Sequence, residues 1–456
     1  MKMNSRSVLG SRRLGFAFVA GVACASFAGC SNGGLDSLQQ LQKAQAANVG
    51  NFSNTIFLGD SLTAGYQSGS LLDTQQVHGW APVLAKQAGF NIVQPLIAFP
   101  GAPNVLQLVS VGPPPVIAAY CGPTPPVCVT TTGRDNFATQ VTDLAVPGAF
   151  VNDVMNTVPM VNPAPGQQQL NQLVLGFPGL GYGQALSQSA QAIAAQPTTI
   201  FLWIGNNDAL IADITGSTAS MTSVANFTTQ YTALITQLTT MTPAHLVIGN
   251  IPDVTQVPYL TPAALVLAEA SQQSGLPTSV LSAILGIVPG DYVNPTGTAQ
   301  VLPILEQQQK GPITDAGVLS AAEVVVVQAQ VNAFNQVIAA QAQAAGATLV
   351  DINALFKQVT ASGLTINGYT GTTAFLGGFF ALDGIHPTNT GYAVVANTFI
   401  DTMNSKIGTK IPDVNLSAVA AADPLWPPNL VVPAVRGAAM PAVAGKSTED
   451  LMLGKR

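Results

Sequence analysis

Three residues of this 456-residue chain have the types that acyl transfer requires. Ser61 ends a short apolar run in "NTIFLGDSLTAGY", and Asp383 and His386 lie close together in "LDGIHPTNTGY". A serine hydroxyl is a weak nucleophile until a neighbouring base takes its proton. A carboxylate beside that base fixes the imidazole tautomer and stabilises the imidazolium. The three residue types therefore suggest a nucleophile, a general base and an orienting acid.

The choice of base is narrow because the chain has only three histidines. His245 opens an apolar run, where a packed histidine is the ordinary interpretation. His78 precedes "GWAPVLAKQAG" and is expected near the start of a helix. His386 stands on a turn rich in Gly, Pro and Asn, where core histidines are rare. Asp383 alone would be interpreted as a turn former, so the hypothesis needs a fold that brings these residues to Ser61.

The residues around Ser61 predict a tight passage from a strand to a helix. Gly59 permits a sharp exit from the strand, and Gly65 lets the next turn lie close beneath. Asp60 has the side chain of a turn-former or helix cap. This turn would present Ser61 at the end of a strand.

The elements that must position these residues follow from hydrophobic patterning. Short apolar runs that end at or near Gly, Asn or Asp predict five strands, at residues 55–58, 143–146, 199–204, 245–249 and 348–352. Stretches with helical spacing occupy residues 183–196, 224–241, 321–346 and 390–405. This alternation predicts a parallel sheet with helices on both faces. Ligands of such sheets bind at the carboxyl ends of the strands, so the polar residues there should gather on one rim.

Three of these strand-end residues are candidate donors to an oxyanion. The Ser61 N–H lies at a helix start, where N–H groups have no intrahelical partner. Gly148 in "LAVPGAFVND" lets the backbone approach closely, and Asn207 in "LWIGNNDAL" offers a side-chain amide. Loss of one donor of this kind typically costs roughly a hundredfold to a thousandfold in rate.

The blocks "GDSLTAGY", "AVPGA", "GNND" and "DGIHP", in this order, resemble the GDSL family of lipases and esterases, also called SGNH hydrolases. "GNIPDVTQVPYL" (249–260) is similar to a segment of the larger, lipase-like members. The blocks span residues 54 to about 404. The resemblance implies a flavodoxin-like α/β/α sandwich with a parallel sheet of about five strands. It does not match the G-x-S-x-G elbow of α/β-hydrolases.

The resemblance also implies roles for individual residues. Ser61, Asp383 and His386 correspond to the catalytic triad of the family, and Ser61, Gly148 and Asn207 to its oxyanion hole. Gly101 in "FPGAP" is a rival to Gly148 for that position. No metal or organic cofactor is expected, and no cysteine or histidine spacing matches a zinc site.

The N-terminus resembles a targeting segment, with a basic start followed by "LGFAFVAGVACASFAG". Cleavage after Ala25 fits the small-x-small pattern of ordinary signal peptides. "FAGC" resembles the lipobox of bacterial lipoproteins, although Phe27 stands where Leu is usual, and it would make Cys30 the lipidated N-terminus. We favour lipidation at Cys30, because "SNGG" after it looks like a flexible tether. The expected location is the cell envelope, as a periplasmic or outer-membrane lipoprotein, or otherwise outside the cell.

Composition and the remaining cysteines restrict the partners. Only 8% of residues are charged, the formal net charge is −6, and no Lys/Arg cluster follows residue 13, which argues against nucleic-acid binding. Cys121 and Cys128 lie in the Pro-rich "CGPTPPVC". An even pair in an exported chain predicts a disulfide that closes a small loop.

The expected organisation is a signal peptide (1–29), a tether (30–50), a hydrolase domain (51–411) and a Pro/Ala-rich tail (412–456), expected to be extended or disordered. Residues 35–50 are compatible with a short helix or a linker. Long insertions at 94–140 and 258–320 are expected to build walls or a lid over the sheet. The apolar stretch "SVLSAILGIVPG" in the second insertion makes Leu281 and Ile284 candidate acyl-binding residues.

These inferences predict an exported serine hydrolase that cleaves carboxylic esters of small molecules or lipids through an acyl-enzyme. Its contact with the membrane would be a lipid anchor on Cys30. Two alternatives stay open. The chain could be a carbohydrate O-acetyl esterase or a thioesterase of the same family, although a sugar site should show exposed aromatics and only three Trp are present. It could also be an inert surface lipoprotein that binds lipid or a partner.

Overall fold

The computed structural model describes residues 32–112, 115–122, 132–136, 140–160, 166–176, 185–430 and 441–453. The chain divides into two units, residues 1–40 and 41–456, and the second contains the sheet and the site. The predicted signal peptide, Cys30 and Cys128 lie outside the described residues. Within the described residues, no helix has the length and apolar character needed to cross a membrane.

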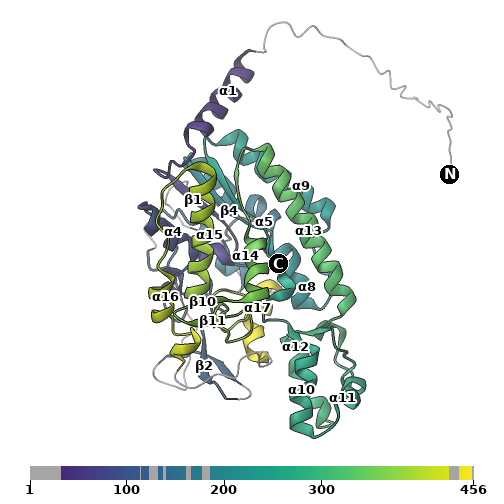
Figure 1. Ribbon diagram of the computed structural model, residues 1–456. Helices are drawn as coiled ribbons and strands as arrows, with labels where there is room; N and C mark the ends of the chain where they lie inside the picture. The colour runs from purple at the N-terminus through teal and green to yellow at the C-terminus, as the bar shows by residue number, and fades with distance from the viewer. Residues whose placement is uncertain are drawn as a thin grey trace, which may run out of the picture. The chain divides into compact units, whose positions relative to one another are not determined.

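The centre of the second unit is a parallel sheet (Figure 1). Its strands, in spatial order, are β1 (Thr55–Gly59), β4 (Thr199–Trp203), β5 (His245–Gly249) and β9 (Thr348–Val350). Each pairs in parallel with its neighbour, with Thr55 opposite Thr199 and Thr199 opposite His245. The predicted parallel sheet is confirmed, and four of the five predicted strands are present.

The fifth predicted strand, 143–146, is an extended edge segment that forms only one isolated bridge, between Phe57 and Asp143. The Leu144 and Val146 N–H groups donate to carbonyl oxygens of β1 over 2.9 and 3.1 Å. The pairing stops there because Val146 already bonds Gly59, the last residue of β1. With this segment beside β1, the order of the runs is 2-1-3-4-5, as in flavodoxin-like sheets.

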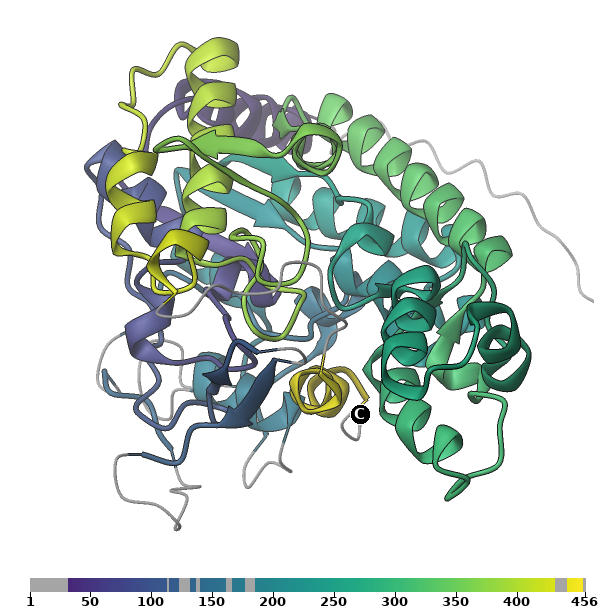
Figure 2. The same ribbon diagram turned by 60° about the horizontal axis from the view of Figure 1, so that its bottom comes forward.

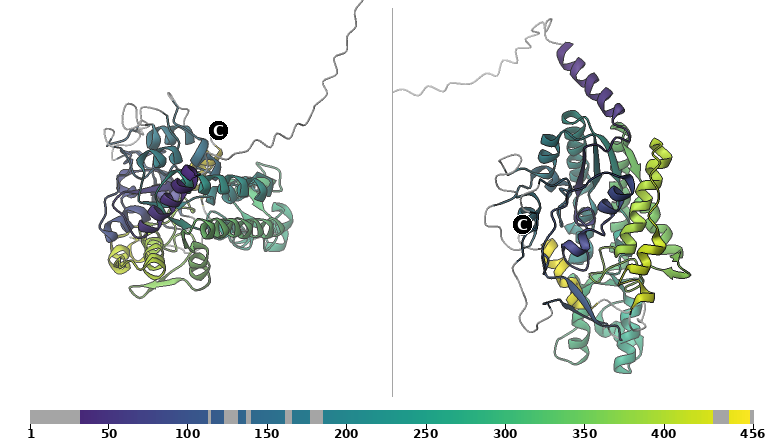
Figure 3. Two further views of the ribbon diagram at one scale, coloured as in Figure 1. Left: turned by 90° about the horizontal axis from the view of Figure 1, so that it is seen from above. Right: turned by 90° about the vertical axis from the view of Figure 1, so that its left-hand side faces the viewer.

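Alternate residues of each strand enter different hydrophobic clusters, so both faces of the sheet are buried. Ile56, Ile200 and Ile248 belong to one cluster, whereas Phe57 and Phe201 belong to the other. The first face is covered by α5 (Val151–Asn156), α7 (Gln188–Ala195), α9 (Val224–Met241) and α13 (Ala321–Ala344), and the second by α4 (Trp80–Ala88) and α15 (Asn389–Ile407). Helices therefore lie on both sides of the strands, as Figure 3 shows and as the sequence predicts.

The long helices agree with the predicted ones. α9 spans the predicted residues 224–241, begins at a Ser223 cap and buries the expected stripe Phe227, Tyr231, Leu234, Ile235 and Leu238. α13 begins with a capping box in which Ser320 and Glu323 bond each other's backbone N–H groups. Helical spacing was informative here because each helix buries one continuous stripe against the sheet.

The insertion at 258–320 has a core of its own. It contains α10 (Ala263–Ser274), α11 (Thr278–Leu285) and α12 (Pro295–Leu305), with a small sheet of β6 (Thr261–Pro262), β7 (Tyr292–Val293) and β8 (Val318–Leu319). The three helices lie side by side in Figure 2 and share a separate hydrophobic cluster. Leu281 is fully buried in that cluster, and Ile284 is 37% exposed.

The chain after residue 412 is not simply extended. α16 (Leu416–Ala422) packs against α15, and α17 (Ala442–Leu453) packs against α8 (Asn206–Thr215), α12 and β3. Leu451 and Met452 are buried in the main core. The expectation of an extended or disordered tail is therefore wrong for these two helices, because a few apolar residues at their ends are enough to dock them.

The remaining elements complete the chain that the structure describes. They are α1 (Asn32–Ala47), α2 (Ser61–Ala64), α3 (Asp73–Gln76), α6 (Gln167–Leu175), α14 (Ile352–Ser362), the hairpins β2–β3 (Leu106–Ser110, Val116–Ala119) and β10–β11 (Leu364–Ile366, Tyr369–Gly371), and 3-10 turns at Thr218–Ser220, Val254–Gln256, Asp315–Gly317 and Pro427–Asn429. The β2–β3 hairpin lies within the first predicted insertion, and α1 covers most of the segment 35–50.

Candidate active site

Ser61 is the first residue of α2, directly after β1. Asp60 caps this short helix, since its side chain accepts a hydrogen bond from the Leu62 N–H over 3.0 Å. A Cβ on Gly59 would lie 2.5 Å from the Trp203 carbonyl oxygen, so no larger residue fits the exit from the strand. Gly65 ends the turn with a φ of 75°, in the left-handed region. The turn predicted from "GDSLTAG" is the one observed.

The fold brings Ser61, His386 and Asp383 together. The His386 Nε2 atom lies 2.8 Å from the Ser61 Oγ atom, and its Nδ1 atom lies 3.0 Å from Asp383 Oδ2. All three side chains are buried, with Ser61 the most accessible at 5%. The structure therefore places a hydroxyl, an imidazole and a carboxylate in one hydrogen-bonded chain, the arrangement on which acyl transfer by a serine depends.

Asp383 is held by more than the imidazole. Its Oδ1 atom accepts the N–H groups of Ile385 and His386, each over 2.9 Å, and its Oδ2 atom accepts the Gly69 N–H over 2.6 Å. Burial alone would raise the pKa of Asp383, but the nearby His386 and these hydrogen bonds hold the pKa below its usual value. The carboxylate therefore stays ionised, as the orienting partner of an imidazolium must.

Two tyrosines, Tyr66 and Tyr392, hold the His386 ring in place. Sequence analysis did not assign them this role. The Tyr66 ring lies against His386, with 4.6 Å between ring centroids. Its hydroxyl donates to the Gly69 carbonyl over 2.7 Å, and the Tyr392 hydroxyl donates to the Tyr66 carbonyl over 2.6 Å. Tyr66 closes the "GDSLTAGY" block, and this position was the one available signal.

A second hydrogen bond joins the ends of β1 and β4. The Asn206 amide donates to Asp60 Oδ2 over 2.8 Å, and both side chains are buried. Burial raises the pKa of Asp60 from 3.8 to about 6, although Asn206, the Leu62 N–H and His386 each act in the opposite direction. This pair fixes Asn207, the next residue, relative to Ser61.

The candidate oxyanion donors lie on converging segments. The Asn207 amide donates to the Ala149 carbonyl over 2.8 Å, which ties it to the residue after Gly148. Gly148 has a φ of 78°, in the left-handed region that favours glycine. Gly101 instead packs beside Ser70, where a Cβ would lie 2.0 Å from the serine hydroxyl. The structure thus joins Asn207 to the Gly148 segment and places Gly101 in a separate turn.

An apolar cavity of about 90 Å³ opens beside Ser61. Ser61, Asn206 and Asn207 contribute its polar groups, and the apolar wall includes Trp203, Leu210, Val254, Val257, Phe356 and Phe380. Neither Leu281 nor Ile284 belongs to this wall, because the second insertion uses its apolar residues for its own core. The apolar surface next to Ser61 comes instead from the ends of β4, the segment after β5, α14 and the stretch before His386.

The other two histidines lie apart from this site. His245 faces Thr348 within the sheet, with 2.9 Å between Nε2 and Oγ1, and His78 lies on the surface beside α4. In the part of the chain that the structure describes, no three His, Cys, Asp or Glu side chains are grouped to hold a metal ion.

Comparison with known proteins identifies the family. The model described as "GDSL-like Lipase/Acylhydrolase" matches residues 56–399. No curated protein matches the chain. Similar solved structures include the acetylxylan esterase Axe2 of Geobacillus stearothermophilus, 12% identical with a TM-score of 0.34 over 79% of this chain and 98% of that one.

Two further structures are comparable. LAE5, an alpha/beta hydrolase enzyme from the metagenome of Lake Arreo, Spain, is 12% identical, with a TM-score of 0.34 over 77% of this chain and 95% of that one. A putative GDSL-like lipase from Parabacteroides merdae is 10% identical, with a TM-score of 0.33 over 77% of this chain and 96% of that one.

Proposed function

The chain belongs to the GDSL-like lipase/acylhydrolase family, and we propose that it hydrolyses carboxylic esters through Ser61, His386 and Asp383. The observation that carries this proposal is the 2.8 Å approach of His386 Nε2 to Ser61 Oγ at the wall of an apolar cavity. A base within hydrogen-bond reach is what activates a serine hydroxyl. The intact chain of contacts to Asp383 also speaks against an inert relative.

The reaction proceeds in two halves. Ser61 Oγ attacks the acyl carbonyl carbon while its proton passes to His386 Nε2. The oxyanion is stabilised by the N–H groups of Ser61 and Gly148 and by the Asn207 amide. When the carbon–oxygen bond to the leaving group breaks, His386 returns the proton to the departing alcohol. Water, deprotonated by His386, then attacks the acyl-enzyme, releasing the carboxylic acid and free Ser61.

The wall composition supports an apolar acyl group. Most of the cavity beside Ser61 is lined by apolar side chains, and its polar side chains, Ser61, Asn206 and Asn207, carry no charge. The carbohydrate O-acetyl esterase alternative finds less support, because all three Trp are buried, including Trp203, which lines the cavity but is only 2% exposed. A thioester is not disfavoured by the cavity and belongs in the substrate panel.

The test is hydrolysis of p-nitrophenyl acetate, butyrate, octanoate and dodecanoate, together with an acyl thioester. Ser61→Ala and His386→Ala should each lower kcat/KM by at least about a thousandfold. Ser53→Ala, which changes an exposed serine just before β1, should behave as wild type. The assignment fails if Ser61→Ala keeps wild-type turnover in a preparation free of other hydrolases.

We also propose that the protein is exported and anchored through lipid on Cys30. The support is the N-terminal sequence alone, with its basic start, apolar run and "FAGC". After expression in a bacterium, wild type should fractionate with membranes and Cys30→Ser should not. Cleavage after Ala25 instead would leave both proteins in the soluble exported fraction and would refute the anchor.

A further inference from the structure

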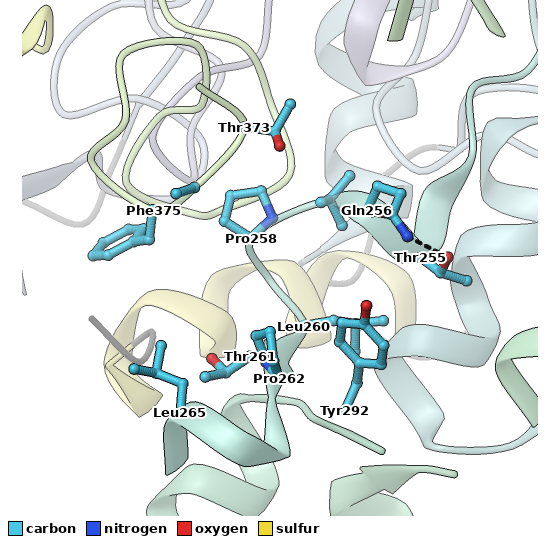
Figure 4. A pocket seen from close by; sticks show the side chains of 12 residues that line it. Thr255, Gln256, Pro258, Leu260, Thr261, Pro262, Leu265, Tyr292, Thr373 and Phe375 are labelled. Carbon is cyan, nitrogen blue, oxygen red and sulfur yellow. Dashed lines mark hydrogen bonds between the residues drawn. The ribbon is translucent and has the colours of Figure 1, made fainter. Parts of the chain in front are cut away.

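A second hollow, here called the distal groove, lies next to the cavity beside Ser61. It has a volume of about 240 Å³ and is formed by residues of the segment 255–262, by Leu265 and Tyr292 of the insertion, and by the loop 373–375. Figure 4 shows Thr373 and Phe375 on one side, Leu265 and Pro262 on the other, and Pro258 between them. Val257 lines both the groove and the cavity beside Ser61, so the two hollows share a wall.

Both sides of the distal groove belong to segments that also build the catalytic site. Val254 and Val257 line the cavity, and the Tyr259 N–H donates to the Gly384 carbonyl over 2.9 Å, within the turn that carries His386. The loop 373–375 leads into Phe380, which lines the cavity and pairs with Pro387. The groove is therefore fixed in position relative to the triad.

The chemistry of the distal groove selects an uncharged occupant. Its apolar wall includes Pro258, Leu260, Leu265 and Phe375, and none of its lining residues is charged. Its polar groups are hydroxyls and one amide, and the Gln256 amide lies 3.5 Å from the Thr255 hydroxyl rather than pointing freely into the groove (Figure 4). Binding of an ionic head group would need a partner charge that this wall does not offer.

The volumes of the two hollows indicate which one can hold the longer part of a substrate. The cavity beside Ser61 has a volume of about 90 Å³ and the groove one of about 240 Å³. The groove therefore offers a long acyl chain more room than the cavity does.

We propose that the distal groove receives the far end of the substrate's acyl chain, which passes Val257 on leaving the cavity. The substrates are then esters of medium-chain to long-chain fatty acids. This inference rests on the proposed ester hydrolysis at Ser61. It assigns the second insertion a part in substrate selection through Leu265 and Tyr292, not through its buried α11.

The test uses substitutions that place a large side chain in the groove from each of its two sides. Leu265→Trp acts from α10 and Thr373→Trp from the opposite loop, and both positions are only partly buried. Ile284→Trp is the matched control, since it adds the same ring to an exposed position of the same insertion outside both hollows. The assay is kcat/KM for p-nitrophenyl esters from acetyl to dodecanoyl.

In wild type, each methylene buried in the groove should raise kcat/KM by about fourfold until the groove is full. Both groove variants should keep acetyl and butyryl turnover within about twofold of wild type and lose about tenfold or more on decanoyl and dodecanoyl esters. Ile284→Trp should follow wild type throughout.

Two results would overturn the inference while leaving ester hydrolysis intact. One is an unchanged long-chain preference in both groove variants, and the other is an equal loss on every chain length, which would make the groove structural. If wild type cleaves none of the esters, the proposed function itself fails.

Discussion

Replacing Asp60 by Asn tests whether burial raises the pKa of the carboxyl beside Ser61. Asp60 is fully buried, and its carboxyl accepts hydrogen bonds from the Leu62 N–H and the Asn206 amide. An asparagine oxygen can still cap α2. Among the described residues, the Asn206 Oδ1 atom has no hydrogen-bond partner, so a rotated Asn206 amide can accept from the new side chain. The substitution thus removes the ionisation with little change in shape.

The pKa of Asp60 determines the expected size of the effect. Burial raises that pKa from 3.8 to about 6 in the folded protein. Between these values the unfolded chain has lost the proton and the folded protein still binds it, so stability falls as pH rises. Below pH 3.8 the contribution is fully present, and above about pH 6 it is lost. At 1.36 kcal/mol per pH unit, the total loss is about 3 kcal/mol.

Asp60→Asn cannot undergo this loss. The difference in unfolding free energy, variant minus wild type, should therefore be about 2 kcal/mol larger at pH 8 than at pH 4, because part of the contribution is already lost at pH 4. A change in hydrogen bonding caused by the substitution shifts this free-energy difference equally at every pH, so it does not affect the comparison between pH 8 and pH 4.

The measurement is urea unfolding at intervals from pH 4 to pH 8, with the free energy extrapolated to water. Asp315→Asn, which changes an exposed carboxylate far from the site in sequence, is the control and should run parallel to wild type. Parallel curves for Asp60→Asn and wild type would refute the reasoning, because they would mean that Asp60 ionises as freely in the folded protein as in the unfolded one.

The remaining predictions concern rate and cross-linking. Asn207→Ala should lower kcat by roughly a hundredfold to a thousandfold with little change in KM, while Asn226→Ala on the exposed start of α9 should change neither; equal effects would remove Asn207 from the oxyanion hole. Asp383→Asn should retain more activity than His386→Ala, because the orienting carboxylate is often the smaller loss. Cys121 and Cys128 should form a bridge, and intact mass that shows two free thiols before reduction would exclude it.

That Ser61, Asp383 and His386 lie together could be predicted from the sequence because their positions depend on local rules. A parallel sheet collects its strand ends on one rim, so residues at the ends of β1 and β4 had to meet. The three-residue separation of Asp383 and His386 lets the carboxylate reach both the imidazole and the backbone of its own turn. Neither inference required knowledge of distant contacts.

Apolar composition did not distinguish a wall of the site from a separate core. "SVLSAILGIVPG" has the same residue types whether it faces a substrate or packs on neighbouring helices. In the structure Leu281 and Leu285 pack with residues of α10 and α12. An insertion with this much apolar surface can bury it within its own core. Its composition therefore predicted that these residues are buried, but not whether they pack against a ligand or against each other.

The prediction for the tail was wrong because the tail has too few apolar residues to give a helical pattern. α17 is held by Leu451 and Met452, two residues at its end, and by the bond between Thr296 and Glu449. Two apolar residues do not make a helical stripe that sequence analysis can recognise. Docking is stabilised by the surfaces of α8 and α12 that the tail covers, and these surfaces belong to segments far from the tail in sequence.

The role that we propose for the distal groove would be harder to predict from sequence than the positions of Ser61, Asp383 and His386. Its two sides come from the segment after β5 and from the loop before His386, which are far apart in the chain and carry no polar motif. What joins them is backbone packing, such as the bond from the Tyr259 N–H to the Gly384 carbonyl. The reacting atoms need particular side chains, whereas an acyl channel needs only uncharged surface of the right shape, so a sequence can specify the first by residue type and the second only through the completed fold.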